Sequence, residues 1–136
     1  MSHTNISAAL STRLGTLPSS PPVAYENAGY TPSEGAAYIS EHYLPAETSV
    51  VGLADDDSND FTGVYQIDVR TPLDAYKAEG NDIADAVLSH FKRGTVMTYS
   101  GQSVVVQTAS RAQGRPSGPW WFIPVSINWR AFSGNV

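Results

Sequence analysis

The chain has 136 residues, is 41% hydrophobic and 15% charged, and carries a formal net charge of −5, a size that fits one domain spanning residues 1–136. The acidic balance argues against a protein that grips nucleic acid, because neutralising phosphates requires many Lys and Arg residues. The sequence has no cysteine, which excludes disulfides and thiolate chemistry, and it shows no membrane-span or signal-peptide pattern, which indicates synthesis in the cytoplasm.

The first third of the chain contains one predicted helix and two predicted strands. Apolar residues at three- and four-residue spacing predict a helix from Thr4 to Leu17, and Pro18 ends it. The segment from Val23 to Tyr25 is predicted to be extended, and the preceding Pro22 restricts it to a sheet edge or a strand start. A further strand is predicted from Tyr38 to Leu44.

The middle of the chain contains a clear alternation. From Phe61 to Thr71, apolar residues at odd-numbered positions predict the buried face of a strand, and polar residues at even-numbered positions predict its other face. A second helix is predicted from Asn81 to Lys92, with Asn81 as its N-cap and Gly94 after its C-terminus.

The last third of the chain predicts a long hairpin. A strand from Ser103 to Arg111 and an alternating strand from Pro119 to Ala131 are joined by turn-forming residues at Gln113 to Gly118. One face of the last strand, expected in the core, carries Trp121, Ile123, Val125, Ile127 and Trp129. The elements together predict an α+β fold, in which two main helices pack on one face of a mostly antiparallel sheet of about five strands.

The other face of the last strand begins with two aromatic residues, Trp120 and Phe122. With Tyr38, Tyr43 and Tyr99 they have two interpretations. Either the helices cover them within the monomer, or they form an exposed patch that anchors a protein interface, where Trp and Tyr are favoured.

The acidic segment 54–60 begins like a calcium-binding loop, with oxygen ligands at Asp55, Asp57 and Asn59. The pattern then fails, because Asp60 stands where a glycine is needed and Gln66 stands where a bidentate glutamate is needed. A solvated acidic loop is the preferred interpretation, with weak Mg²⁺ or Ca²⁺ binding at those three residues as the alternative.

No pattern in the sequence predicts catalysis. Serine-nucleophile, phosphate-loop and dinucleotide glycine motifs are absent. The three histidines, His3, His42 and His90, have no metal-like neighbour four residues away and read as ordinary surface or boundary residues. We therefore expect neither an enzyme nor a cofactor.

Charge is distributed unevenly along the chain. Nine acidic residues and no Lys or Arg lie between Arg13 and Arg70, whereas five basic residues and no acid follow Asp85. If the two halves form different faces, the acidic face of one copy complements the basic face of the next in a heterologous contact. Pairing of the halves inside one monomer is the alternative. The residues predicted for a subunit interface are Trp120, Phe122, Arg111, Arg115, Asp55, Asp56, Asp57 and Asp60.

The order of these elements resembles that of the tail terminator proteins of long-tailed bacteriophages. The resemblance covers Ile6 to Phe132, and its most telling blocks are Ala24–Asn27 (AYEN), Leu44–Glu47 (LPAE) and the alternating strand from Ile123 to Phe132. These blocks are not catalytic motifs, so the resemblance rests on the order of the elements and on coverage.

The resemblance implies a structural protein of the virion tail that assembles in the cytoplasm of the host bacterium. Such proteins form a ring, a hexamer in the assembled tail, at the head-proximal end of the tail tube. The ring stops polymerisation of the tube protein and offers a surface to the head–tail connector. DNA only passes through the lumen, and no membrane is involved.

Three other classes of protein stay open at this stage. The first is another neck component, such as a head–tail joining or tail-completion protein. The second is a non-viral α+β binding module with a pocket near Trp120. The third is a metal-dependent hydrolase that uses the segment Asp55 to Asp60.

Overall fold

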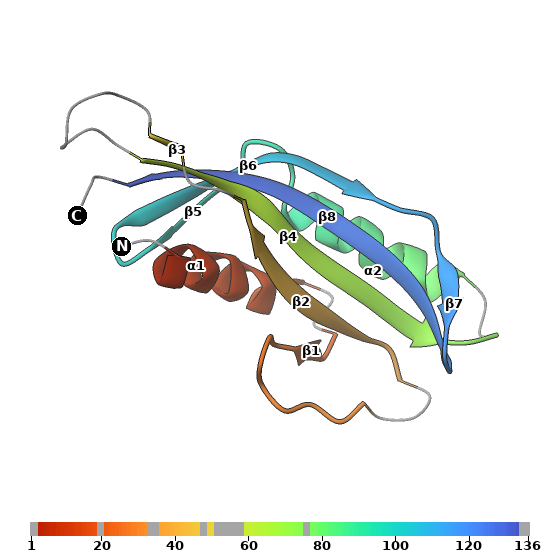
Figure 1. Ribbon diagram of the computed structural model, residues 1–136. Coiled ribbons are helices and arrows are strands. Elements are labelled where there is room, and N and C mark those ends of the chain that lie inside the picture. Colours follow the sequence, from red (N-terminus) through yellow and green to blue (C-terminus); the bar gives the residue numbers. More distant parts are fainter. Residues whose placement is uncertain are drawn as a thin grey trace.

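The computed structural model describes residues 3–18, 21–32, 36–46, 49–50, 59–74 and 77–133 (Figure 1). The helices are α1 (His3–Gly15) and α2 (Ala78–His90). The strands are β1 (Val23–Ala24), β2 (Tyr38–Pro45), β3 (Ser49–Val50), β4 (Asn59–Pro72), β5 (Val96–Tyr99), β6 (Gln102–Arg111), β7 (Arg115–Ser117) and β8 (Trp120–Ser133).

The strands form one sheet in the order β1-β2-β4-β8-β6-β5, while β3 pairs with β4 and β7 pairs with β8. Only β1 and β2 run parallel; the other pairs described are antiparallel. The long strands β4 and β8 lie side by side along the whole sheet, from Asn59↔Ser133 to Pro72↔Trp120 (Figure 1). The predicted α+β fold is confirmed, but the expected five strands were too few, because β5 and two short strands were not foreseen.

The core lies between the helices and one face of the sheet. Odd-numbered residues of β4 and β8 form this face, and the predicted alternation is confirmed except at Trp121, which was expected in the core but is only half-buried. Glycine 80 in α2 lies so near the sheet that a Cβ there would be 3.0 Å from Ile123 Cδ1, and Ser11 in α1 reaches Glu41 on β2. In the sheet, the fully buried side chains include Ile39, Tyr65, Ile67, Val69, Ile123, Val125, Ile127 and Trp129.

The helix α1 has the predicted position and apolar stripe, since Ile6, Leu10 and Leu14 are completely buried. The helix α2 starts three residues earlier than predicted. Asn81 is therefore not the N-cap: its backbone N–H donates to Lys77 O (2.9 Å) as part of the first turn. No helix in the part of the chain that the structure describes is long and apolar enough to cross a membrane.

The predicted C-terminal hairpin is present, with an additional strand in its connection. Strand β6 pairs with the second half of β8, with a shift of register between Val106 and Thr108. The connection that we predicted as a turn over 113–118 contains β7, which pairs with the start of β8. The tight reversal is at Gly118, whose φ of +58° suits glycine.

A buried glutamate joins α1 to the sheet. Glu41 accepts hydrogen bonds from the Ser11 hydroxyl (2.6 Å), the Tyr65 hydroxyl and the backbone N–H of Glu26 (3.0 Å). These donors compensate for removing the carboxyl group from water. Burial, followed by the charge of Glu41, raises the pKa of Tyr65, so its hydroxyl stays protonated and remains a donor.

Candidate functional site: the open face of the sheet

The even-numbered residues of β4 and β8 form a second face of the sheet, which we call the open face because neither described helix packs on it. Cross-strand register assigns Arg70, Arg115 and Arg130 to this face. Among the side chains that the structure describes, Asp68 is the one acid of β2, β4, β7 or β8 on this face. The open face is therefore basic, although the protein as a whole is acidic.

Four residues form a row across the open face that alternates aromatic and cationic side chains. Tyr38 pairs with Arg70, Arg70 pairs with Phe122, and Phe122 pairs with Arg115, across strands β2, β4, β8 and β7. The Arg70 Cζ atom lies 4.8 Å from the Phe122 ring centroid and 6.0 Å from that of Tyr38. The Arg115 Cζ atom lies 5.0 Å from the Phe122 centroid. We call these residues the cation–aromatic row; each contact is within the range of a cation–π attraction.

The carboxylate of Asp68 already has partners within the open face. Its Oδ1 accepts a hydrogen bond from Gln66 (2.7 Å), and its Oδ2 lies 3.0 Å from His42 Nε2 and 3.7 Å from Arg70 Nη2. Asp68 is only 3% exposed. The Arg70 Nη1 atom is buried and has no hydrogen-bond partner within the described residues. The row thus keeps an unsatisfied donor and a positive charge.

The predicted aromatic patch divides into separate groups. Trp120 meets Tyr38 edge to face at 5.2 Å beside the row. Phe122, expected as exposed or covered by a helix, is instead 8% exposed and covered by arginine side chains. Tyr43 stacks on the core residue Trp129 (5.5 Å), and Tyr99 lies on the far strand β5.

The predicted separation of charge occurs in a different form. The exposed side of α2 carries three acids, Glu79, Asp82 and Asp85, and α2 lies on the side of the sheet opposite the open face. Glu41, from the acidic half of the sequence, is buried. Asp55, Asp56 and Asp57 lie outside the described residues, Asn59 and Asp60 are described only as backbone of β4, and the calcium alternative is untested.

Two arginines that we predicted for the subunit interface, Arg111 and Arg115, have side chains on opposite faces of the sheet. Arg111 donates from Nη1 to the Asn81 side-chain oxygen on α2 (2.7 Å), whereas Arg115 lies over Phe122 on the open face. The sheet therefore separates them. The arginine that shares the open face with Arg115 is Arg70, not Arg111. The one signal in the sequence for this placement was the even-numbered position of Arg70 in the predicted strand from Phe61 to Thr71.

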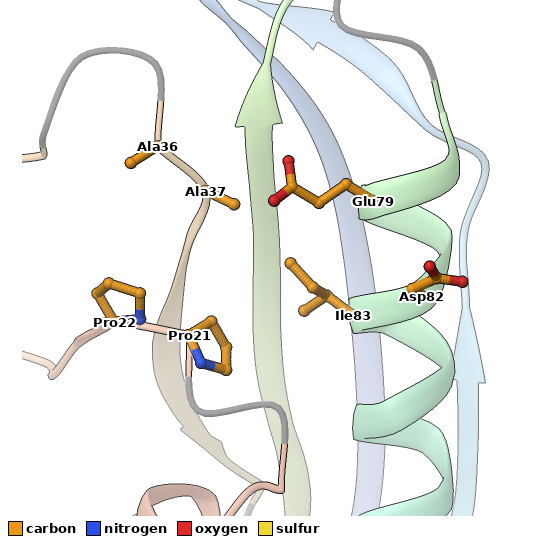
Figure 2. Close-up of a pocket in the computed structure, with 7 residues that line it drawn as sticks. All are labelled: Pro21, Pro22, Ala36, Ala37, Glu79, Asp82 and Ile83. Carbon is orange, nitrogen blue, oxygen red and sulfur yellow. The ribbon is translucent and has the colours of Figure 1, made fainter.

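A hollow of about 590 Å³ lies between α2 and the segments that flank β1 and β2 (Figure 2). Figure 2 shows that Glu79 and Ile83 point from α2 toward these segments, whereas Asp82 points away from them. The remaining lining residues are Pro21, Pro22, Ala36 and Ala37. Apart from the carboxylates of Glu79 and Asp82, the lining is apolar.

The described residues contain no group of three or more His, Cys, Asp or Glu side chains that is arranged to hold a metal ion. The histidines all have local partners: His3 Nδ1 lies 2.6 Å from the Tyr43 hydroxyl, His42 binds Asp68, and His90 binds Arg13 O. The architecture is that of a two-layer α+β protein with a basic open sheet face.

Comparison with known proteins identifies its family. The family model for phage tail terminator proteins matches residues 5–129. The chain belongs to this family, which is structural and not enzymatic, and it is a component of the virion tail. A solved structure of a protein whose name states no function is 26% identical, with a TM-score of 0.77 and 96% of each chain covered. No curated protein matches the sequence.

Proposed function

We propose that this protein forms a ring that caps the head-proximal end of a phage tail tube. In this function the ring ends polymerisation of the tube protein and presents the surface to which the head–tail connector attaches. DNA passes through the lumen of the ring. The ring assembles in the cytoplasm of the host bacterium, and its closed form in the tail is a hexamer.

The observation that carries the proposal is the family match over residues 5–129, which spans both helices and nearly the whole sheet. The structure adds two compatible features. Neither of the described helices packs on one face of the sheet, and the exposed charges on α2 and on the open face have opposite signs. A protein with complementary surfaces on opposite sides assembles head to tail, and a head-to-tail contact closes into a ring when the rotation between copies permits it.

Electron microscopy and sedimentation of the purified protein test the ring directly. We expect closed rings at high protein concentration, and tail tubes of uniform length with a terminal ring when the protein is added during polymerisation of its tube protein. Tubes that grow equally long with and without the protein would contradict the capping function. A head–tail joining protein, the next alternative, would bind the connector without changing the length of the tubes.

A further inference from the structure

Two charged surfaces on opposite sides of the sheet provide the two halves of a contact between copies. We propose that the acidic side of α2 from one copy docks on the cation–aromatic row of the next copy. The inference rests on the proposed ring, because it specifies which surfaces meet when one copy joins another. The acidic side of α2 is defined by the exposed residues Asp82 and Asp85.

The row is suited to binding carboxylates. Arg70 and Arg115 hold two positive charges against the same ring, that of Phe122, and like charges this close repel each other. The nearby Asp68 is buried and shared among three partners, so it does not neutralise both guanidinium groups. An incoming carboxylate would accept hydrogen bonds from the exposed guanidinium group of Arg115 and reduce the repulsion, and guanidinium–carboxylate hydrogen bonds are among the stronger ones.

Two exposed acids of α2 share one side of the helix. Asp82 and Asp85 are three residues apart, so their side chains are neighbours on the helix surface. Arg70 and Arg115 come from β4 and β7, which flank β8, so their backbones are about 10 Å apart. The helix therefore presents two adjacent negative charges, and the row presents two positive charges. The basic ends of α2, at Lys77 and at Lys92 with Arg93, lie outside this acidic stretch.

The geometry also favours a head-to-tail contact over a two-fold dimer. In a two-fold contact through the open face, the arginines of one copy would meet the arginines of the other. The helix and the open face lie on opposite sides of the sheet, so each copy offers one surface to each neighbour, and the contact is heterologous.

Charge reversal on each surface tests the contact. Arg115→Glu changes an exposed member of the row, and Asp82→Lys changes the acidic side of α2. Arg93→Glu, beyond the helix, is a control with the same change of charge as Arg115→Glu. We expect each of the first two variants to weaken self-association by about ten-fold or more in sedimentation at low salt. We expect the control to associate at least as well as the unmodified protein. Circular dichroism establishes that each variant is folded.

Mixing the two weakened variants is the decisive measurement. In a head-to-tail assembly, alternating copies of Arg115→Glu and Asp82→Lys create one contact of reversed charges and one unmodified contact, so association should recover. A folded Arg115→Glu variant that forms rings as the control does would overturn the inference. A mixture that associates no better than either variant alone would also overturn the inference. In both cases, the proposed function would still stand if the unmodified protein forms rings.

Cysteine cross-linking provides a readout that does not depend on affinity. The sequence has no cysteine, so single cysteines can be introduced without competing thiols. Ser117→Cys lies on β7 beside the row, and Ser89→Cys lies two turns after Asp82 on α2, and both positions are exposed. We expect disulfide-linked dimers in a mixture of the two variants, well above the amount that each forms alone. Equal cross-linking in all three samples would contradict the contact.

Two other outcomes separate competing explanations. Binding of a short double-stranded DNA by the unmodified protein but not by Arg115→Glu, with assembly unchanged, would assign the row to phosphate and overturn the inference. An unmodified protein that forms no ring, either alone or on tail tubes, would overturn the proposed function and the inference together.

Discussion

Arg13 and His90 each bind the backbone carbonyl oxygen of the other. Arg13 donates from Nε and Nη2 to His90 O, at 3.1 and 2.9 Å, and His90 donates from Nε2 to Arg13 O at 2.8 Å. Both residues lie in the last turn of their helices, where the backbone carbonyl groups lack the regular helical donors. Arg13 supplies the donors to His90 O, and His90 adds a donor to Arg13 O, which also accepts from the backbone N–H and the hydroxyl of Thr16 (3.1 and 2.7 Å). The pair fixes the C-terminal ends of α1 and α2 to each other.

Replacing Arg13 by Met should separate these two helix ends. The variant leaves His90 O without its donors, and we expect the free energy of unfolding to fall by roughly 1–3 kcal/mol. Urea denaturation followed by circular dichroism measures the change. Arg93→Met removes an equal charge at an exposed position and should change stability by less than about 0.5 kcal/mol. Equal effects of the two substitutions would show that the Arg13–His90 pair contributes little.

The same pair predicts a dependence of stability on pH. Burial lowers the pKa of His90 from its ordinary value, and the charge of Arg13 acts in the same direction, although the hydrogen bond to Arg13 O opposes both. The unfolded chain, with a histidine pKa of about 6.5, then binds the proton more readily than the folded protein does. Stability should therefore decrease as the pH falls below about 6.5.

Urea midpoints between pH 7.5 and 5.5 measure this dependence. The matched variant is His90→Gln, which keeps a donor for Arg13 O but does not titrate. We expect its midpoint to fall less over this range than that of the unmodified protein, and the difference isolates His90 from His3 and His42. Parallel pH profiles for the two proteins would contradict the lowered pKa.

Gly63 lies opposite Trp129 in β4 and β8, and only a glycine fits there. A Cβ built on Gly63 would be 2.6 Å from Leu44 O and 2.7 Å from Trp129 Cζ2, closer than such atoms approach in proteins. Gly63→Ala should therefore displace the ring or strand β2, with a loss of about 1–3 kcal/mol in the free energy of unfolding. Gly29→Ala, which would meet nothing within 4 Å, is the control. If Gly63→Ala leaves the free energy of unfolding unchanged, the strands can move apart at this position without loss of stability.

Local patterns in the sequence predicted the core of this fold well. Alternation in β4 and β8 is a period-two signal that depends on each strand alone, and it identified Tyr65, Ile127 and Trp129 as core residues. The start of α2 was predicted wrongly. Asparagine is a residue type that is favoured at the N-cap, but the backbone N–H of Asn81 donates to Lys77 O within the first turn of the helix. Residue type alone does not distinguish an N-cap position from a position in the first turn.

The candidate site was harder to predict, because it depends on which strands are neighbours. Arg70, Phe122 and Arg115 come from three parts of the sequence and meet only through the pairing of β4, β8 and β7. The pattern of residues within one strand does not indicate which residues of the neighbouring strands lie beside it. Arg111 and Arg115 were both predicted for the subunit interface, but their side chains point to opposite faces of the sheet, because Arg111 pairs with Val125 and Arg115 pairs with Phe122.

The salt dependence of self-association distinguishes an electrostatic contact from an apolar one. Guanidinium and carboxylate groups at the rim of a contact are screened as the Debye length falls from about 10 Å at 0.1 M salt to about 3 Å at 1 M. We expect association to weaken progressively over this range, and the slope to be smaller for Arg115→Glu than for Arg93→Glu. Association that is insensitive to salt in the unmodified protein would show that charge contributes little to the contact.

The three tryptophans should respond differently to truncation, because they have different environments. Trp129 is completely buried, so Trp129→Ala should lower the free energy of unfolding by roughly 3–5 kcal/mol. Trp121, which we expected in the core, is only half-buried at the margin of the core over Gly114, and its truncation should cost less. Trp120 is also half-buried, but it lies beside the row against Tyr38, on the open face.

Trp120→Ala should therefore leave the monomer nearly as stable as before, within about 1 kcal/mol, while it weakens assembly. Tyr99→Ala is the matched control, because it removes an exposed aromatic ring from β5, on the other edge of the sheet, and should not change assembly. Urea denaturation and sedimentation of the four variants measure both properties. If Trp120→Ala destabilises the monomer as strongly as Trp129→Ala does, Trp120 stabilises the fold itself. If Trp120→Ala and Tyr99→Ala assemble equally well, the contact between copies does not include the Trp120 end of the open face.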